Sequence, residues 1–547
     1  MKKGLLRIMI ALLFVGSIPI AFASAAPKPE GEIVIAIGAL GREVWTPLDG
    51  SMPEHYVMGI WNEKLIYRGI GKDQKLYGGL AESWEISADG LTYTFNIRKG
   101  VNFNEGWGPF TAEDALYSLQ TIGRQDSISA GKHIIREWVE SMKVVNPYVL
   151  RIKLKEPHPD FTYWLSDFTP YLMMVSKKYF ETVGEKKAAS HPVGTGPWIL
   201  KEHVLGDHIT LEAVDNHWRK TPEFKKVTIK IVPEQGTAVA MLRAGSADLV
   251  NLSTAFLKEV EGAGFKVISN PGDTFYTVSF GGQCLSTREG YDPSCPWAQK
   301  DAKRALQVRK AMCLAINKQE IIDYLLKGKG TQVSVHIYPP GGPYTDPAWK
   351  PYPYDPKEAK RLLAEAGYSN GFEKPIKMYL FSTQGRQEMP DIGEAVAENW
   401  EKIGLKVVRQ PIDNATLRDI YFSRSKGVRW STYVLGSTPY VEPALWYYAC
   451  SQTTGRCDQL FESPEIDKLT LAATNATNLE VRTKKNLELG QYVYDNYLAS
   501  PIAMKDGLWG ASPKIAGWSL NNLNAYLHNL EYIHKKNKGE DKQHKGF

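Results

Sequence analysis

The stretch VTIKIVPEQGTAVAML at residues 227–242 decides the fold class. Val227 to Val232 alternate apolar and polar side chains, as a half-buried strand does, and an apolar-periodic helix between Thr237 and Leu242 follows. Further strands are expected at Ile209–Ala213 and Phe275–Phe280. Because strands alternate with helices, this part of the chain is expected to form an α/β body.

Similar patterns extend toward the N-terminus. Strands are expected at Glu32–Ile37 and Val149–Leu154, and Leu91 to Ile97 alternate as a hairpin strand does. Thr111 is a good N-cap for a helix that follows it. These elements place further strands and helices before the central α/β stretch.

A second α/β body is expected in the C-terminal half. Asp355-Pro356-Lys357-Glu358 combines a capping residue, a proline at the first helical position and an acid three residues after the cap, and Gly367 is the stop. A helix from about Ile392 to Ile403 then leads into a strand at Leu405–Val408. The overall prediction is therefore two α/β bodies in one chain.

Composition and charge limit the class of protein. The chain has 547 residues, of which 43% are hydrophobic and 23% charged, as in a soluble globular protein of about three domains. Lys2, Lys3 and Arg7 carry half of the net charge of +6, and the tail from Lys535 carries the other half. Because the body between them is neutral, nucleic acid is not expected as a partner.

The N-terminus predicts export. A basic region at 1–7 precedes an apolar run at Ile8–Phe22 and the small residues Ala23-Ser24-Ala25, which is the pattern of a cleaved signal peptide at 1–25. The run contains Pro19 and is shorter than the roughly 20 residues that span a bilayer. No cysteine lies near the cleavage site, so a periplasmic protein without a lipid anchor is expected.

The five cysteines fit an oxidising compartment. Cys284 and Cys295 enclose one loop and Cys450 and Cys457 enclose another, so two local disulfides are expected. Cys313 is then a small buried apolar residue. These spacings match no zinc module, and no metal is expected.

Short catalytic motifs are missing from the sequence. It contains no nucleotide-binding glycine loop, no Gly-x-Ser-x-Gly, no His-Glu-x-x-His and no CxxC. Their absence makes an enzyme less expected without excluding one, and no cofactor is expected. Hydrolases that use a pair of carboxylates have no short motif, so an exported two-lobed hydrolase stays an alternative.

An ordered series of motifs resembles one known family. The chain is similar to family 5 of bacterial extracellular solute-binding proteins, the peptide, opine and nickel group that serves ABC importers. The resemblance spans roughly residues 33–518. Its motifs are Leu80–Trp84, Asp89–Phe95, Arg98–Phe103, Pro109–Asp114, Val193–Trp198, Asp215–Trp218, Arg309–Met312, Ala315–Lys318 and Tyr354–Lys360.

The resemblance implies a two-lobed periplasmic binding protein fold with an extra domain and two hinge crossings. The first lobe is expected at 27–70, 193–283 and 503–547, the extra domain at 71–192 and the second lobe at 284–502. It implies a monomer that takes a small-molecule or short-peptide ligand to a membrane ABC permease. A peptide or modified amino acid is favoured, with an opine-like or sugar-like solute next; a peptide chaperone or signal receptor on this scaffold is the other alternative.

Candidate ligand-binding residues also follow from the resemblance. Several relatives keep an arginine for a ligand carboxylate where Arg386 stands, and Trp430, Tyr433 and Tyr440 flank the family's ligand loop, with Ser437 among them. Trp45 follows the opening strand and offers a stacking face.

One departure from the family pattern concerns the ligand's amino group. Peptide-binding relatives pair that group with an aspartate where this chain has Pro439. A buried ammonium without a partner is costly, so a peptide with a free amino end requires Glu442 or another acid in that role.

Overall fold

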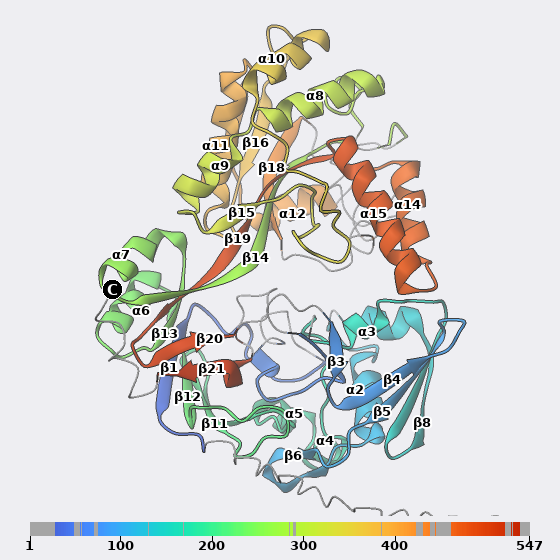
Figure 1. Cartoon of the computed structure of the whole chain (residues 1–547), viewed down its shortest axis with the longest axis vertical. Coiled ribbons are helices and arrows are strands. Elements are labelled where there is room, and N and C mark those ends of the chain that lie inside the picture. Colours follow the sequence, from blue (N-terminus) through green and yellow to red (C-terminus); the bar gives the residue numbers. More distant parts are fainter. Residues whose placement is uncertain are drawn as a thin grey trace, which may run out of the picture.

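The computed structural model shows two lobes and a third domain (Figure 1). The expected signal peptide at 1–25, Tyr440 and Glu442 lie outside the described residues. The described ranges are 28–48, 55, 57–69, 75–129, 131–167, 169–283, 285–287, 291–383, 385–422, 430–437, 444, 461–519, 527 and 529–536.

One mixed sheet runs through both lobes. Within the described ranges it joins eleven strands, and β1 lies between β12 and β13, parallel to both. β15 (Gly330–Gln332) pairs with β19 beside the main path. The strands in spatial order are β10 (Trp198–Val204), β11 (His208–Ala213), β12 (Lys226–Ile231), β1 (Glu32–Ile37), β13 (Leu249–Leu252), β19 (Ala499–Ala511), β14 (Lys266–Phe280), β18 (Ser431–Ser437), β16 (Ile376–Leu380) and β17 (Val407–Pro411).

Two long strands connect the lobes. β14 and β19 are antiparallel neighbours that run from the first lobe into the second (Figure 1). Their register shifts between Asn270 and Thr274 and again between Tyr276 and Thr277, so the ladder is irregular where the strands cross. The α/β two-lobed fold class is confirmed, and these strands are its two hinge crossings.

The third domain has its own sheet and core. β4 (Ala81–Ile86), β5 (Thr92–Ile97), β9 (Val149–Leu154) and β8 (Val139–Asn146) form an antiparallel sheet, against which α2 (Ala112–Ile122) packs. Leu65 and Ile66 already belong to this core, although they precede the expected boundary at 70. The division of the chain at 70, 192, 283 and 502 stays a prediction.

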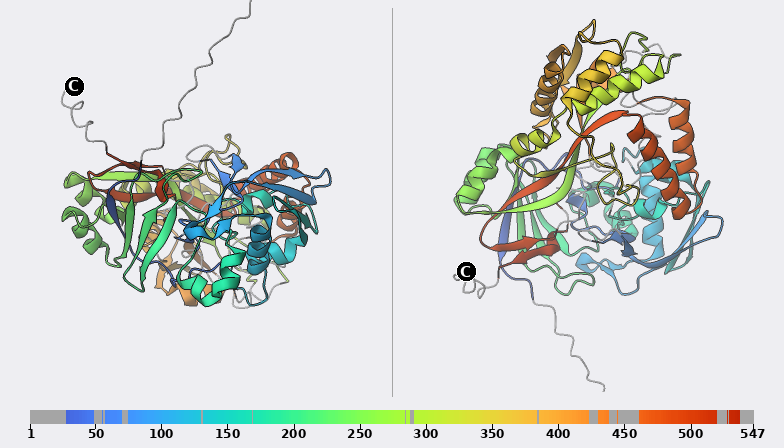
Figure 2. Two further views of the ribbon diagram at one scale, coloured as in Figure 1. Left: turned by 90° about the horizontal axis from the view of Figure 1, so that it is seen from below. Right: turned by 45° about the horizontal axis from the view of Figure 1, so that its top comes forward.

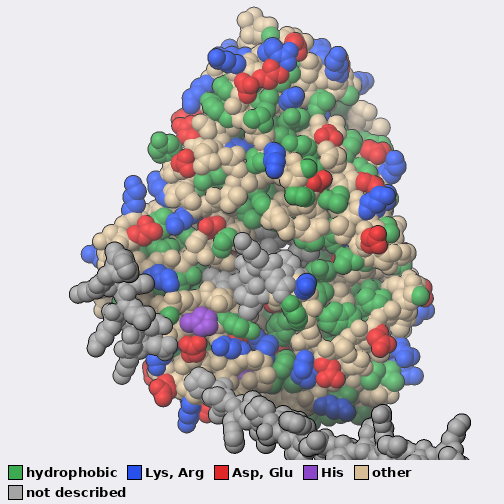
Figure 3. Space-filling view, viewed as in Figure 1, with side chains coloured by type: hydrophobic (Ala, Val, Ile, Leu, Met, Phe, Trp, Pro, Cys, Tyr) green, Lys and Arg blue, Asp and Glu red, His purple; other side chains and the backbone are tan. Residues whose placement is uncertain are grey.

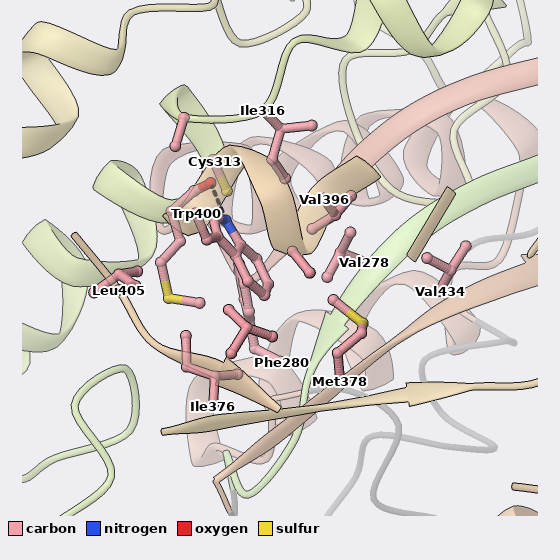
Figure 4. Close-up of a cluster of buried hydrophobic side chains, with 14 of the residues drawn as sticks. Val278, Phe280, Cys313, Ile316, Ile376, Met378, Val396, Trp400, Leu405 and Val434 are labelled. Atoms are coloured by element: carbon pink, nitrogen blue, oxygen red, sulfur yellow. Dashed lines mark hydrogen bonds between the residues drawn. The ribbon is translucent and has the colours of Figure 1, made fainter. Parts of the chain in front are cut away.

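The second lobe is organised around Trp400 (Figure 4). Its indole Nε1 donates to the backbone oxygen of Met312 at 2.9 Å, and Phe280 and Cys313 lie in the same buried cluster. Cys313 is fully buried, which confirms its expected apolar role. The principal helices of this lobe are α8 (Ala302–Leu314), α10 (Pro356–Glu365), α11 (Met389–Lys402), α12 (Asn414–Phe422), α14 (Pro464–Thr474) and α15 (Leu479–Asp495).

The expected Cys284–Cys295 disulfide is corrected by the structure. Cys295 is a free thiol, fully buried in the second-lobe core with Trp297 nearby in the chain, and burial raises its pKa well above the ordinary value. Its expected partner Cys284 lies outside the described residues, as do Cys450 and Cys457. The second pairing stays a prediction.

Surface character agrees with a globular protein. On the face in Figure 3, basic and acidic side chains are interspersed rather than gathered by sign. Of the helices in the described ranges, none combines the length and apolar character that a membrane span requires.

Candidate functional site

A cavity of about 680 Å³ lies between the lobes beside the hinge strands. The first lobe contributes residues that follow β1, β12 and β13, the hinge strands contribute Asp273 and Lys505, and the second lobe contributes Gly385, Arg386 and Gln387. This volume lies within the range of pockets that bind small molecules.

The first-lobe wall follows from strand topology. Because β1, β12 and β13 are parallel, their carboxyl ends meet at one edge of the sheet, where ligands of α/β folds commonly bind. Gly38 follows β1, Glu234 follows β12 and Ser253 follows β13. Gln235, at the start of α6 (Gln235–Arg243), accepts from the backbone N–H of Ser253 at 3.1 Å, which holds this polar wall together.

Arg386 brings a cation to the opposite wall. Its backbone N–H donates to the oxygen of Thr383 at 2.9 Å in the turn that precedes α11. The side chain passes over β18 at Gly436, where an added Cβ would come within 2.6 Å of Arg386 Cδ. Glycine therefore leaves the room that the arginine needs to reach this position.

A buried network supports the hinge side of the cavity. Lys505 Nζ donates to Glu388 Oε1 at 3.0 Å, and the hydroxyl of Tyr276 donates to Glu388 Oε2 at 3.1 Å. The Lys505 and Glu388 side chains are only 7% and 9% exposed. Burial, together with the charge of Glu388, raises the pKa of Tyr276 well above its ordinary value, so Tyr276 stays a hydrogen-bond donor.

Two of the expected aromatic contacts are instead core residues. Trp45 is 1% exposed, lies edge-on to Trp61 and donates from Nε1 to His203 Nδ1 at 3.3 Å. Tyr433 is fully buried in the second-lobe core, where its ring faces Phe381 at 6.3 Å between centroids. The expectation that they form stacking faces in the cleft is wrong, because both rings are enclosed by the lobes that carry them.

Trp430 and Ser437 stand at opposite ends of β18. Trp430 packs near Trp297, with 5.8 Å between centroids, and its Nε1 donates to Ser294 Oγ at 3.2 Å. A strand of this length separates it from Ser437 by about 20 Å. Ser437 lies next to Gly436, the glycine that Arg386 crosses, but neither Ser437 nor Trp430 lines the cavity.

Several cavity residues were not anticipated from the sequence. Glu234 and Gln235 directly follow an expected strand, which is a usable signal in an α/β fold. Lys505 is a lone cation within the mostly apolar run Ala499–Ala511, and a charge buried in such a strand requires a partner. Asp273 carries no comparable signal, because its position depends on the irregular pairing of β14.

No group of three or more potential metal ligands occurs in the part of the chain that the structure describes. The site as described is a cleft lined by apolar side chains, such as Phe256 and Trp509, together with charged side chains of both signs. Two lobes joined by two strands around such a cleft define a binding protein of the hinged, two-lobed class.

Comparison with known proteins identifies the family. Residues 75–455 match bacterial extracellular solute-binding proteins, family 5, middle region. Heme-binding protein A of Haemophilus influenzae is 28% identical over 471 residues, which are 80% of this chain and 81% of that protein. The nickel-binding periplasmic protein of Escherichia coli is 28% identical over 385 residues, 69% of this chain and 68% of that protein.

A solved structure supports the same assignment of fold. NikA from Brucella suis, in complex with Fe(III)-EDTA, has a TM-score of 0.77 and 21% identity, over 93% of this chain and 100% of that chain. The match to the family covers well over half of the sequence. This chain belongs to family 5 of the bacterial extracellular solute-binding proteins.

Proposed function

We propose that the protein is the periplasmic substrate-binding component of an ABC importer and that its lobes close around a small organic solute. A peptide or modified amino acid that bears a carboxylate is favoured, ahead of an opine-like or sugar-like solute. The relatives include a heme-binding protein and a nickel-binding periplasmic protein, which supports the class of protein. These two relatives bind different solutes, so they do not indicate which solute this chain binds. The solute class is therefore argued from this chain's own cavity.

Arg386 is the observation that carries the solute class. It lines the cavity from the second lobe, and a guanidinium can bind a carboxylate through two parallel hydrogen bonds. Gln235 and Ser253 face the same cavity from the first lobe. A solute that contacts both walls binds the closed form more tightly than the open form and so shifts the molecule toward closure.

We also propose that no reaction follows binding. The cavity contains two carboxylates, Glu234 and Asp273, which are the groups that the alternative of an exported hydrolase would use. Mass spectrometry of solute recovered after incubation separates the two functions. An unchanged solute supports transport, and a product would favour the hydrolase.

Arg386→Ala tests the proposed carboxylate contact. A thermal-shift panel of short acidic peptides, glutathione, opines, sugars and nickel–histidine first identifies a solute, because a ligand that prefers the folded closed form raises the melting temperature. We expect the variant to weaken a carboxylate-bearing solute by about 1.5–3 kcal/mol in isothermal titration calorimetry, since a charge-assisted hydrogen bond is lost.

The matched control is Arg361→Ala. Arg361 lies on α10, its side chain is 55% exposed and it pairs with Glu358 and Glu365 away from the cavity. Its removal should leave the affinity unchanged. Equal affinity of the wild type and Arg386→Ala would remove Arg386 from the binding site and with it the argument for a carboxylate.

A further inference from the structure

The second lobe contacts the third domain at a point far from the hinge strands. α14 and α15 lie above α3 (Phe161–Trp164) on the right of Figure 1, whereas β14 and β19 cross nearer the left. The right-hand view in Figure 2 shows the same two helices beside the third domain. Rotation of the lobes about the hinge strands would therefore separate the groups at this contact.

An ion pair bridges this contact. Arg482 of α15 places Nη2 at 2.9 Å from Oδ1 of Asp160, the residue that precedes α3. Both side chains are only 1% exposed. Asp160 belongs to the third domain and Arg482 to the second lobe, so the pair exists only while these two bodies are in contact.

One further hydrogen bond is made by each member of the pair. Arg482 Nη1 donates to the backbone oxygen of Thr474 at 3.1 Å, and Trp164 Nε1 donates to Asp160 Oδ2 at 3.2 Å. Such additional bonds are the condition under which a buried ion pair repays the cost of removing two charges from water.

Apolar and backbone contacts seal the pair from solvent. Tyr163 of α3 packs against the core beneath α14 and α15. Gly90, in the β4–β5 turn, lies so close to the α14–α15 turn that an added Cβ would be 3.1 Å from the backbone oxygen of Thr477. The pair is therefore dry while the bodies are in contact and would become hydrated when they part.

We propose that Asp160 and Arg482 are positioning residues that stabilise the closed form even without solute and so raise solute affinity from outside the cavity. In the closed form each charge is the partner of the other, so loss of one leaves a buried charge uncompensated. In the open form water solvates both, and the same loss costs little. The inference rests on the proposed hinge closure but on no particular solute.

Small-angle X-ray scattering of the ligand-free protein tests this proposal. We expect Arg482→Met to lower the ratio of closed to open molecules at least tenfold, seen as a larger radius of gyration than that of the wild type. Asp160→Asn should act in the same direction, and it keeps an oxygen for Trp164 Nε1. The double variant leaves no charge to bury and should return to the wild-type radius.

The control is Arg361→Met, which removes an arginine from an exposed ion pair on the same lobe and should not change the radius. Circular dichroism of each variant checks that it is folded. A radius of gyration that is the same in the wild type and both single variants would overturn the proposal. Since no solute is added, a failure of the carboxylate hypothesis does not affect this result.

Discussion

At the scale of single residues, His336 is a buried histidine close to the hinge strand β14. It is fully buried, and its ring lies edge-on to Phe275 with 5.8 Å between centroids. Burial lowers its pKa from the ordinary value of 6.5 to about 3, so the folded protein holds it neutral. The unfolded chain takes up a proton there near pH 6.5, which makes folding stability depend on pH.

The sign of this dependence gives a prediction. Between about pH 6.5 and pH 3 the unfolded state binds more protons at His336 than the folded state does. Acidification over this range therefore lowers the free energy of unfolding of the wild type by up to about 1.4 kcal/mol per pH unit, relative to a variant that cannot titrate at this position. We expect the stability of the wild type minus that of His336→Leu to decrease from pH 7 to pH 4.5 in urea unfolding. A difference that stays constant over this range would contradict the neutral, buried histidine.

Of the candidate residues that the resemblance suggested, the cation lines the cavity, whereas two of the aromatics do not. Arg386 lies in the cavity wall, whereas Trp45 and Tyr433 lie in lobe cores. The reason is physical: a charged side chain is rarely buried in an apolar core unless it is paired, but an aromatic ring occurs both in cores and in binding sites. Only the packing of the strands determines which face of β18 Tyr433 occupies.

At the scale of elements, α10 shows how far local signals reach. The predicted cap, first-turn proline and terminating glycine are all present, and Asp355 accepts from the backbone N–H of Glu358 at 2.9 Å. We expect Asp355→Ala to cost about 1 kcal/mol through loss of this cap. Hydrogen exchange of peptides that cover Pro356–Glu365 should accelerate several-fold.

The exposed Lys360 on the same helix provides the control for this measurement. Lys360→Ala changes no cap, and alanine has the highest helix propensity, so exchange should be unchanged or slower. Equal acceleration in both variants would mean that the cap of α10 contributes nothing specific.

Long-range pairing limited the prediction of other elements. β1 and β9 occupy the expected residues, and α11 begins three residues before its expected start. In contrast, only the last part of the 15-residue β14 was expected, and the 13-residue β19 was not. Their length comes from pairing with each other across more than 200 positions, which no local pattern encodes.

At the scale of the whole molecule, a buried charge network joins segments that lie far apart in the sequence, around residues 63, 219 and 531. Arg219 donates from Nε to Glu63 Oε1 at 3.1 Å and from Nη1 to Glu531 Oε1 at 2.6 Å. Its guanidinium also lies over the ring of Tyr67 at 4.5 Å. Burial works to raise the pKa of Glu63, but hydrogen bonding to His217 and the charge of Arg219 outweigh it and lower that pKa. No motif in the sequence indicates this network, since its members are distant along the chain.

Removal of the shared cation should therefore destabilise the packing of these segments against one another. Arg219→Met leaves the carboxylates of Glu63 and Glu531, only 1% and 2% exposed, without their common partner, at an expected cost of about 3–5 kcal/mol. Differential scanning calorimetry should show a lower melting temperature or a separate early transition. Arg243→Met, which breaks an exposed pair with Glu259, should cost less than about 1 kcal/mol. If the two variants have the same melting temperature, the network contributes no more to stability than a surface ion pair does.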